Sequence, residues 1–396
     1  MKSTKIDKAV SILGCRGIPG NYGGFETFAE RLALHLTEQG WAVTVYCQAD
    51  TVKQIREETW NGIRLIQVPS PDAGAFGSVL FDWKAVKHAA NESRLVLTLG
   101  YNTAIFGLLY RLKNVTNLIN MDGLEWRRQK WRLPEKAWLY INEWLGSWLG
   151  NHLIADHPAI KTHLSSRVSG DKITVIPYCE EPPSKVDALL LNAYQLKPNQ
   201  YALIIARPEP ENHILEIVSA FSSRPRGHKL VVLGNYRPKK FEYHRKVLEA
   251  ASDEVVFLGA IYDKAVLAAL RCCTRLYVHG HAVGGTNPSL VEALSAGSAV
   301  LAHDNPFTRW VAGPEARYFK DASDCSAKFD QLMDDPETLA RMQQASLDRY
   351  WEDFSDQRDL KAYEALLTQY AANLSPVRQP QKAAPLAKVE SRTKAL

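Results

Sequence analysis

The chain has 396 residues, 46% hydrophobic and 23% charged, a composition typical of a globular protein rather than a disordered or fibrous one. Because this length exceeds what one ordinary hydrophobic core accommodates, we expect two domains. The formal net charge of +5 is too small to require a nucleic-acid partner, and we expect none.

The termini and the cysteines bear on where the protein works. The first ten residues are too few and too polar for a signal peptide, and no apolar run approaches the length of a transmembrane helix. None of the six cysteines forms a Cys-x-x-Cys pair, so neither a zinc site nor a disulfide framework is indicated. We therefore expect reduced thiols and a cytoplasmic location.

The first half of the chain alternates between short apolar runs and amphipathic stretches. Ala9–Gly14 predicts a buried strand, followed by a glycine-rich loop and a helix from Phe25 to Gln39. The loop contains neither Gly-x-Gly-x-x-Gly nor Gly-Lys-Ser/Thr, which disfavours a dinucleotide-dependent oxidoreductase and a P-loop enzyme. Further strands are predicted at Ala42–Cys47, Ile63–Val68, Leu95–Leu99, Asn117–Met121, His152–Ala155 and Ile173–Ile176. Further helices are predicted at Val79–Asn91, Thr103–Leu112 and Pro158–Ser165.

A second alternating set follows residues 181–198, a segment that we interpret as a linker from its prolines. Its predicted strands are Tyr201–Ala206, Lys229–Leu233, Val255–Leu258, Arg275–Val278 and Ala299–Ala302. Its predicted helices are Ile214–Phe221, Phe241–Ala251 and Lys264–Cys272. Repeated β/α alternation predicts a parallel sheet covered on both faces, so we expect an α/β protein with two Rossmann-like domains, at 1–180 and 199–352. A helix at 353–374 is expected to pack back toward the first domain, and 375–396 to form a disordered tail.

The stretch 279–297 has the pattern of a strand end, a glycine turn and a helix start. Asn287 is placed to cap this helix, and Pro288 suits its first position. The unpaired N–H groups of the first turn suit an anion such as phosphate. Glu292 shares a helix face with Ser289 and can accept hydrogen bonds from sugar hydroxyls. The alternative is a glycine loop that caps an ordinary helix with a solvated glutamate.

Five tryptophans lie between residues 126 and 148, interleaved with arginine and lysine. Tryptophan and basic residues together favour a membrane interface, with Trp131, Arg132, Lys136 and Trp138 as candidate contacts to the membrane or the acceptor. A core helix beside a solvated basic loop is the simpler alternative. Stacking on single-stranded nucleic acid is disfavoured because the charge is modest and gathered at one helix.

Two Rossmann-like halves joined by a proline-rich linker resemble the GT-B glycosyltransferases. The residues at 204–212 and 280–297 resemble the donor-nucleotide motifs of the retaining glycosyltransferases of family 4. The residues at 14–27, Gly-Cys-Arg-Gly-Ile-Pro-Gly-Asn-Tyr-Gly-Gly-Phe-Glu-Thr, are similar to a branch of rhamnosyltransferases of bacterial polysaccharide assembly. The resemblance covers nearly the whole chain up to Ala371. It implies transfer of a sugar from a dTDP-, UDP- or GDP-linked donor to a lipid-linked saccharide, by an enzyme peripheral on the inner face of the plasma membrane.

The resemblance also implies roles for individual residues. Glu292 matches the glutamate that binds the ribose, and Arg207 matches a basic residue that contacts phosphate. The helix start that meets the diphosphate corresponds to Thr286, Asn287 and Ser289. The other donor-binding candidates are Gly23 and Gly24 in the N-terminal loop, Asn212 after Arg207, Asn235 and Ile261 in the loops that usually hold the base, and His281 and Gly284 in the glycine turn.

Gly284 departs from the family pattern. Many members carry a first glutamate there, which contacts the sugar, so this carboxylate is missing and His281 and Asp304 are the nearby candidates to replace it. A lysine that follows Arg207 in many relatives is also absent, which leaves one phosphate charge less compensated. A site with one polar contact fewer is compatible with a 6-deoxy sugar such as rhamnose.

Transfer from a nucleotide sugar requires stabilisation of the leaving diphosphate, which backbone N–H groups and an arginine can provide without a metal. We expect Arg207 and the amides of 286–289 to do this, with no obligatory cofactor and no metal site. The alternative for Arg207 is an ion pair with Glu209 or Glu211. Asp122 and Glu125 follow a predicted strand and are candidates to orient the acceptor or act as base, although an ordinary Asp-Gly turn with a solvated glutamate would give the same pattern.

Two other functions stay open at this point. One is a nucleotide-sugar epimerase of the same fold, against which the tryptophan-rich basic helix argues. The other is a catalytically inactive partner subunit, which the missing carboxylate at Gly284 suggests.

Overall fold

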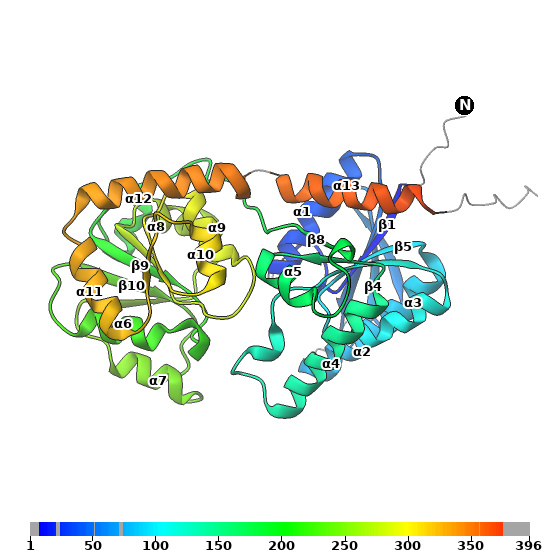
Figure 1. The fold of residues 1–396 in the computed structure, drawn as a ribbon, viewed down its shortest axis with the longest axis horizontal. Helices are drawn as coiled ribbons and strands as arrows, with labels where there is room; N and C mark the ends of the chain where they lie inside the picture. Colours follow the sequence, from blue (N-terminus) through cyan, green and yellow to red (C-terminus); the bar gives the residue numbers. More distant parts are fainter. Residues whose placement is uncertain (1–7, 21–23, 51, 71–73, 356, 375–396) are drawn as a thin grey trace, which may run out of the picture.

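The computed structural model describes residues 8–20, 24–50, 52–70, 74–355 and 357–374. Gly23 and the predicted tail at 375–396 lie outside the described residues. The chain forms two α/β domains that lie side by side, each built on its own sheet (Figure 1).

The first domain contains an eight-stranded sheet with the order β3-β4-β2-β1-β5-β6-β7-β8. Its strands are β1 (Ala9–Leu13), β2 (Ala42–Ala49), β3 (Arg56–Trp60), β4 (Ile63–Pro69), β5 (Leu95–Leu99), β6 (Thr116–Asn120), β7 (His152–Ala155) and β8 (Ile173–Val175). Neighbouring strands pair in parallel except β3, which is antiparallel to β4. The sequence does not predict β3 because its residues are polar, as suits an exposed edge strand.

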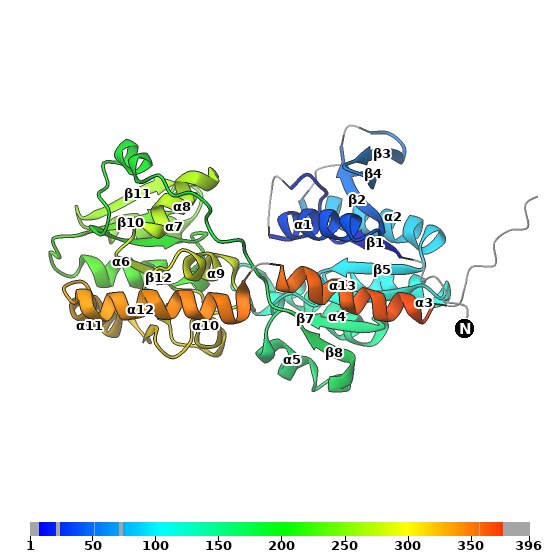
Figure 2. The ribbon, with the colours of Figure 1, turned by 90° about the horizontal axis from the view of Figure 1, so that it is seen from above.

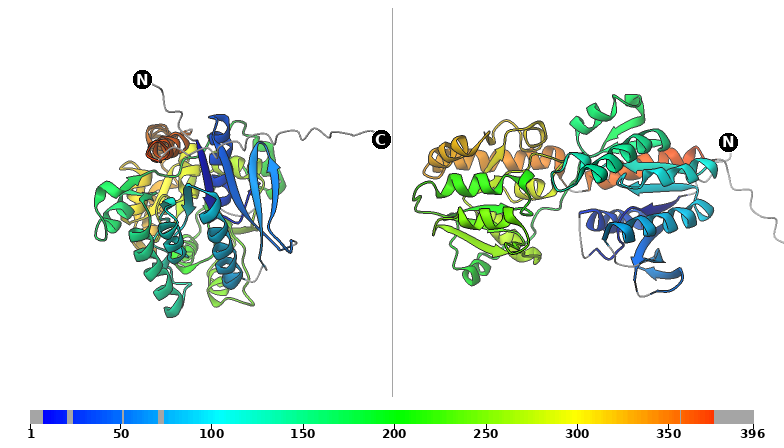
Figure 3. Two further views of the ribbon diagram at one scale, coloured as in Figure 1. Left: turned by 90° about the vertical axis from the view of Figure 1, so that its right-hand side faces the viewer. Right: turned by 90° about the horizontal axis from the view of Figure 1, so that it is seen from below.

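Helices cover both faces of this sheet, which explains why most residues of its central strands are apolar and buried (Figure 3). They are α1 (Gly24–Glu38), α2 (Gly74–Glu92), α3 (Leu108–Leu112), α4 (Leu133–Leu149) and α5 (Pro158–Leu164), with short 3-10 turns η1 (Ala104–Gly107), η2 (Glu125–Arg127) and η3 (Gly170–Lys172). The helix predicted at Thr103–Leu112 is thus divided into η1 and α3.

The second domain contains a six-stranded parallel sheet with the order β11-β10-β9-β12-β13-β14. Its strands are β9 (Tyr201–Ile205), β10 (Lys229–Leu233), β11 (Val255–Gly259), β12 (Leu276–His279), β13 (Val300–His303) and β14 (Arg317–Phe319). Its helices are η4 (Ala188–Tyr194), η5 (Pro210–Asn212), α6 (Ile214–Ser222), α7 (Glu242–Glu249), α8 (Lys264–Cys272), α9 (Pro288–Ser295), α10 (Pro306–Ala312), α11 (Ala322–Leu332) and α12 (Pro336–Arg349). The strand order reverses between β9 and β12, and such switch points place ligands outside the carboxyl ends of the strands.

The C-terminal helices cross from the second domain to the first. A π-helical turn, η6 (Tyr350–Phe354), joins α12 to α13 (Arg358–Ala372), and the two helices run in line over both domains (Figure 2). Leu360 and Leu367 of α13 are buried in the core that includes α1. The Asn120 amide donates a 2.7 Å hydrogen bond to the Tyr363 hydroxyl, which ties α13 to the end of β6.

The helix α4 is anchored by a buried carboxylate. Glu143 is 1% exposed and accepts hydrogen bonds of 2.8 Å from Trp126 Nε1 and from the His163 ring, and it also pairs with Arg167. Because Trp126 lies in η2, these bonds fix the segment that links β6 to α4. That segment extends toward the second domain (Figure 1).

His279, the last residue of β12, is a buried histidine at the switch point. It is 1% exposed, and neither ring nitrogen has a hydrogen-bond partner among the described residues. Its ring stacks on His281 with centroids 4.3 Å apart. Burial, assisted by His303, lowers the pKa of His279 to about 3, so this imidazole is neutral in the folded protein near pH 7.

We predict that His279 makes the second domain sensitive to acid. Its folded pKa lies below the unfolded value of about 6.5, so the unfolded state binds the proton more readily and stability is lost as the pH falls below about 6.5. The loss from this one group is about 2 kcal/mol at pH ~5. Urea unfolding of wild type and His279→Phe, each at pH ~7.5 and ~5, measures it. The difference in the free energy of unfolding between the two pH values should be smaller by that amount in His279→Phe. The packing cost of the substitution cancels because it is the same at both pH values. An unchanged difference would contradict the prediction.

Candidate active site

The predicted helix start at the glycine turn is confirmed. The Asn287 side chain caps α9 by accepting a 3.0 Å hydrogen bond from the Ser289 N–H, and Pro288 is the first helical residue. The helix ends at Ser295, ahead of Gly297, whose φ of +66° favours glycine. The start of α9 therefore lies at the carboxyl edge of the sheet with no charged side chain in its first turn, and the Asn287 cap takes the N–H group of Ser289.

Glu292 is held in place by an arginine rather than left solvated. Its carboxylate forms an ion pair with Arg271 of α8, and its side chain remains 30% exposed. Burial raises the pKa of Glu292, and Arg271 opposes this shift. Ser289, one turn earlier, pairs its hydroxyl with the Tyr277 hydroxyl at 2.6 Å. The helix thus carries a positioned carboxylate that hydroxyl groups can still reach.

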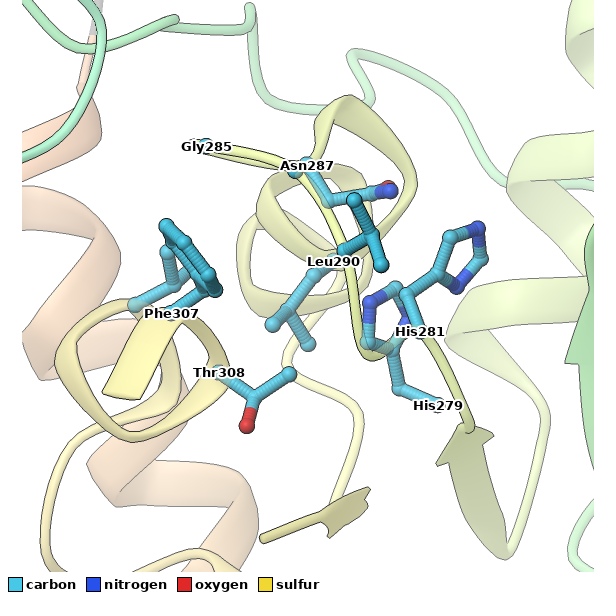
Figure 4. A pocket seen from close by; sticks show the side chains of 10 residues that line it. His279, His281, Gly285, Asn287, Leu290, Phe307 and Thr308 are labelled. Atoms are coloured by element: carbon cyan, nitrogen blue, oxygen red, sulfur yellow. The ribbon is translucent and has the colours of Figure 1, made fainter. Parts of the chain in front are cut away.

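A small pocket lies between the glycine turn and α10 (Figure 4). Gly284, Gly285 and Asn287 form one side of it, and Phe307 and Thr308 the other. His281 also lines the pocket, but burial lowers its pKa well below the usual range, so its imidazole is neutral.

Arg207 follows β9 and is exposed. It forms no ion pair among the described residues, so the alternative of a pair with Glu209 or Glu211 is wrong. Glu209 instead lies 3.8 Å from Arg128 of the first domain, and both carboxylate oxygens of buried Glu211 lack a hydrogen-bond partner in the described chain. Asn212 supports the loop by donating a 2.8 Å hydrogen bond to the Arg207 carbonyl. The guanidinium of Arg207 is accordingly open to an external anion.

Two further cations reach this place from the first domain. Arg128 pairs with Glu125 at 2.5 Å and contacts Glu209 of the second domain. The pKa of Lys130 is affected by these charged groups and by Arg207. Burial lowers its pKa, the Arg128 and Arg207 guanidinium groups lower it further, and Glu125 and Glu209 oppose the shift. Positive charge from both domains therefore converges beside the glycine turn.

Carboxyl groups lie opposite the glycine turn, at the ends of two adjacent strands. Asp122 follows β6 with a φ of +48°, and burial, reinforced by Glu125, raises its pKa to about 6. Glu125 is itself buried and paired with Arg128, so it is not a solvated surface residue. Asp156, which follows β7, is a further carboxyl group of this wall that was not predicted from the sequence. Its place directly after a predicted strand, like that of Asp122 after β6, could have indicated it.

The two domains touch at this point. The Asp156 carboxylate accepts a 3.0 Å hydrogen bond from the Thr286 N–H, and the Thr286 hydroxyl donates to the Asp156 carbonyl. A Cβ atom on Gly123 would lie 3.1 Å from the Cα of Gly284. The turn after β6 and the end of β7 thus form the wall opposite the glycine turn.

The remaining candidates are more scattered. The Arg309 Nε donates a 2.5 Å hydrogen bond to the Asp304 Oδ1. Because this carboxylate is already paired, Asp304 is a poor substitute for the carboxylate missing at Gly284. Asn235 follows β10 and is exposed. Ile261 is partly buried and packs against the hydrophobic core of the second domain. Gly24 begins α1. Among the described residues, no group of three or more His, Cys, Asp or Glu side chains is arranged to hold a metal ion.

The predicted membrane contacts lie on and before α4. Arg132 is exposed, Trp131 and Lys136 are partly buried, and Trp138 is 40% exposed while its Nε1 donates a 2.8 Å hydrogen bond to the Asn102 carbonyl. This helix is not a core helix, because its large apolar side chains include several that face solvent.

Each of the two domains matches a known protein family. Residues 7–181 match a domain of unknown function, DUF1972, and residues 192–349 match the family "Glycosyl transferases group 1". No protein with curated annotation matches the chain.

Solved structures match over both domains. Sucrose-phosphate synthase from Thermosynechococcus elongatus has a TM-score of 0.74 at 18% identity, covering 92% of this chain and 99% of its own. Anabaena HepE in complex with UDP gives 0.69 at 13% identity, with 91% and 100% covered. The trehalose 6-phosphate synthase of Burkholderia multivorans gives 0.70 at 11% identity, with 93% and 98% covered.

The expected two-domain fold is confirmed by these likenesses, and the activity by the family match of the second domain. The chain is a glycosyltransferase with the GT-B fold, and its residues 192–349 match the group 1 glycosyl transferases.

Proposed function

We propose that the protein is a retaining glycosyltransferase of family 4. It transfers a sugar, with L-rhamnose as the candidate, from a nucleoside diphosphate to a lipid-linked saccharide in bacterial surface polysaccharide assembly. One observation carries the donor side of this proposal: the capped, uncharged start of α9 lies at the switch point, beside an arginine that has no internal ion-pair partner among the described residues.

The leaving diphosphate gains negative charge as the sugar departs. Arg207 and the N–H groups of Thr286 and Asn287, directly ahead of the first turn of α9, are the proposed donors that stabilise this charge. Lys130 and Arg128 add positive charge from the first domain, which offsets the absence of a lysine after Arg207. HepE was crystallised in complex with UDP and with UDP-glucose. UDP-linked sugars are therefore the first donors to test, followed by dTDP- and GDP-linked sugars.

In the proposed retaining reaction, the acceptor hydroxyl oxygen attacks C1 from the face that the phosphate leaves. The bond from C1 to the phosphate oxygen breaks, and the hydroxyl proton passes to that oxygen. Asp122 then orients the acceptor rather than removing its proton, and Glu125 acts through Arg128. Glu292 binds the ribose, supported by Arg271.

The acceptor is proposed to be presented by a membrane surface. Leu133, Ile141 and Trp148 of α4 are 82%, 53% and 56% exposed, and Arg127 and Arg132 beside them are exposed as well. Exposed apolar side chains continue on the neighbouring helices α2 and α3 at Phe76, Trp83, Leu108 and Leu112. An apolar patch flanked by basic residues is typical of a peripheral interface. No helix in the described part of the chain is long and apolar enough to cross a bilayer.

Incubation with UDP-, dTDP- and GDP-linked sugars and a bacterial membrane lipid extract tests the function. Mass analysis should find a lipid-linked saccharide heavier by one sugar residue, with the deoxyhexose donor giving the largest yield. Free epimerised nucleotide sugar would instead identify an epimerase. Donor binding without any transfer would identify an inactive partner subunit.

Arg207→Ala is predicted to lower kcat/KM for transfer by about 100-fold or more, because it removes a preorganised charge from the leaving group. The free energy of unfolding should change by no more than about 0.5 kcal/mol, since Arg207 is exposed and unpaired within the described chain. Arg245→Ala on α7, where the arginine side chain is 54% exposed, is the matched control and should leave transfer unchanged. Equal activity of the two variants would refute the role of Arg207.

Leu133→Ser and Ile141→Ser are each predicted to weaken binding to anionic lipid vesicles by about 10-fold, because a buried leucine or isoleucine contributes about 1.5–3 kcal/mol. Tyr262→Ser provides the control, as this side chain is 83% exposed but belongs to the second domain. Co-sedimentation with vesicles containing phosphatidylglycerol measures the change. The patch on α4 is not the membrane surface if all three variants bind like wild type.

A further inference from the structure

Asp156 is a partly buried carboxylate that the proposed mechanism leaves unused. It follows β7 at the carboxyl edge of the first sheet, and its side chain is directed at the second domain. Its Oδ2 accepts a 3.0 Å hydrogen bond from the Thr286 N–H, one residue ahead of the cap of α9. The carboxylate therefore occupies the Thr286 N–H, which is one of the backbone groups proposed to bind the diphosphate of the nucleotide sugar.

Two consecutive glycines make this approach possible. A Cβ atom on Gly285 would lie 2.0 Å from the Asp156 Oδ1, so any other residue there would exclude the carboxylate. Gly284 has a φ of +150°, a conformation that other residues rarely adopt. The glycine turn thus offers no side chain of its own at this place, and the first domain supplies the polar group instead.

The carboxylate is only partly satisfied. Its Oδ1 is buried and has no hydrogen-bond partner among the described residues. Burial raises the pKa of Asp156 well above its usual range, and the nearby Asp122 carboxylate raises it further. An unpartnered carboxyl oxygen inside a cleft costs free energy unless a ligand brings a hydrogen-bond donor to it.

We propose that Asp156 is a specificity-determining residue that hydrogen-bonds hydroxyl groups of the transferred sugar. This inference rests on the proposed function. The Thr286 N–H is a single donor that is already paired with the Asp156 Oδ2. A phosphate oxygen of the donor that accepts from this N–H therefore displaces Asp156 from it. The sugar is bonded to that phosphate through its C1 oxygen, and its hydroxyls consequently arrive beside the released carboxylate.

Hydroxyl groups are the ligands that fit this carboxylate. They are neutral donors, so they can satisfy both oxygens without the repulsion that a second phosphate would meet. A site that hydrogen-bonds substrate hydroxyls discriminates strongly against analogues that lack them, because its own buried group is then left unpaired. Asp156 would accordingly determine which sugar is bound, while α9 and Arg207 bind the nucleoside diphosphate.

Binding of matched probes with and without the sugar tests this role. The pairs are UDP with UDP-glucose, dTDP with dTDP-L-rhamnose and GDP with GDP-mannose, measured by calorimetry on the full chain for wild type, Asp156→Asn and Asp156→Ala. Asp171→Ala removes an exposed carboxylate of the same domain and is the matched control. Asp156→Asn keeps the side-chain volume and guards against loss of folding in the alanine variant.

For the pair that wild type binds, Asp156→Ala should leave the affinity for the nucleoside diphosphate unchanged or higher. Its affinity for the nucleotide sugar should fall by about 10-fold and kcat/KM for transfer by about 10- to 100-fold, with a smaller loss in Asp156→Asn. Equal changes for both members of the pair would overturn the inference, since Asp156 would then act only on the phosphate loop or the domain contact. Wild type that binds none of the probes would overturn the proposed function together with it.

Discussion

The contact between the glycine turn and the strand ends of the first domain constrains the rest of the structure. Gly123, Gly284 and Gly285 lack the Cβ atoms that would separate the two walls, and the hydrogen bonds of Asp156 and Thr286 close the remaining gap. Because α9 begins beside this contact, the Thr286 N–H directly ahead of its cap pairs with the opposite domain rather than with bulk solvent. The helix C-terminal to the second domain, α13, packs on the first and ties the two domains together from the other side.

The charged groups of the cleft form two adjoining sets. Arg207, Arg128 and Lys130 gather where a diphosphate is proposed to bind, and Glu125 and Glu209 hold Arg128 between the domains. Asp122 and Asp156 lie at neighbouring strand ends, where burial makes their charged forms unfavourable. This division is consistent with cations for the leaving group and carboxyl groups for hydroxyls.

Much of the fold could be predicted from the sequence because most of its parallel strands are short, predominantly apolar runs. The strand Leu95–Leu99 and the cap at Asn287 followed directly from such local patterns. The edge strand β3 could not, because its polar residues gain their strand conformation only by pairing with β4. The break between η1 and α3 likewise depends on packing, since the Asn142 side chain of α4 accepts a hydrogen bond from the Ile105 N–H.

The site was less accessible to sequence reasoning, because its geometry joins distant segments. Local spacing offered Glu209 as a partner for Arg207, whereas the structure brings Glu209 to Arg128 across the cleft. Arg128 and Lys130 belong in sequence to the tryptophan-rich basic segment, and only the fold brings them to the cleft. Asp156 and Thr286 are 130 positions apart, and nothing in either neighbourhood predicts that they meet.

A crystal structure of the full chain with a bound nucleotide sugar would test the central claim most directly. The account predicts density for the diphosphate between Arg207 and the first turn of α9, with the ribose at Glu292 and the sugar toward the strand ends of the first domain. A nucleotide sugar bound elsewhere on the protein, or a cleft in which the Thr286 amide still pairs with Asp156 at saturating ligand, would contradict it.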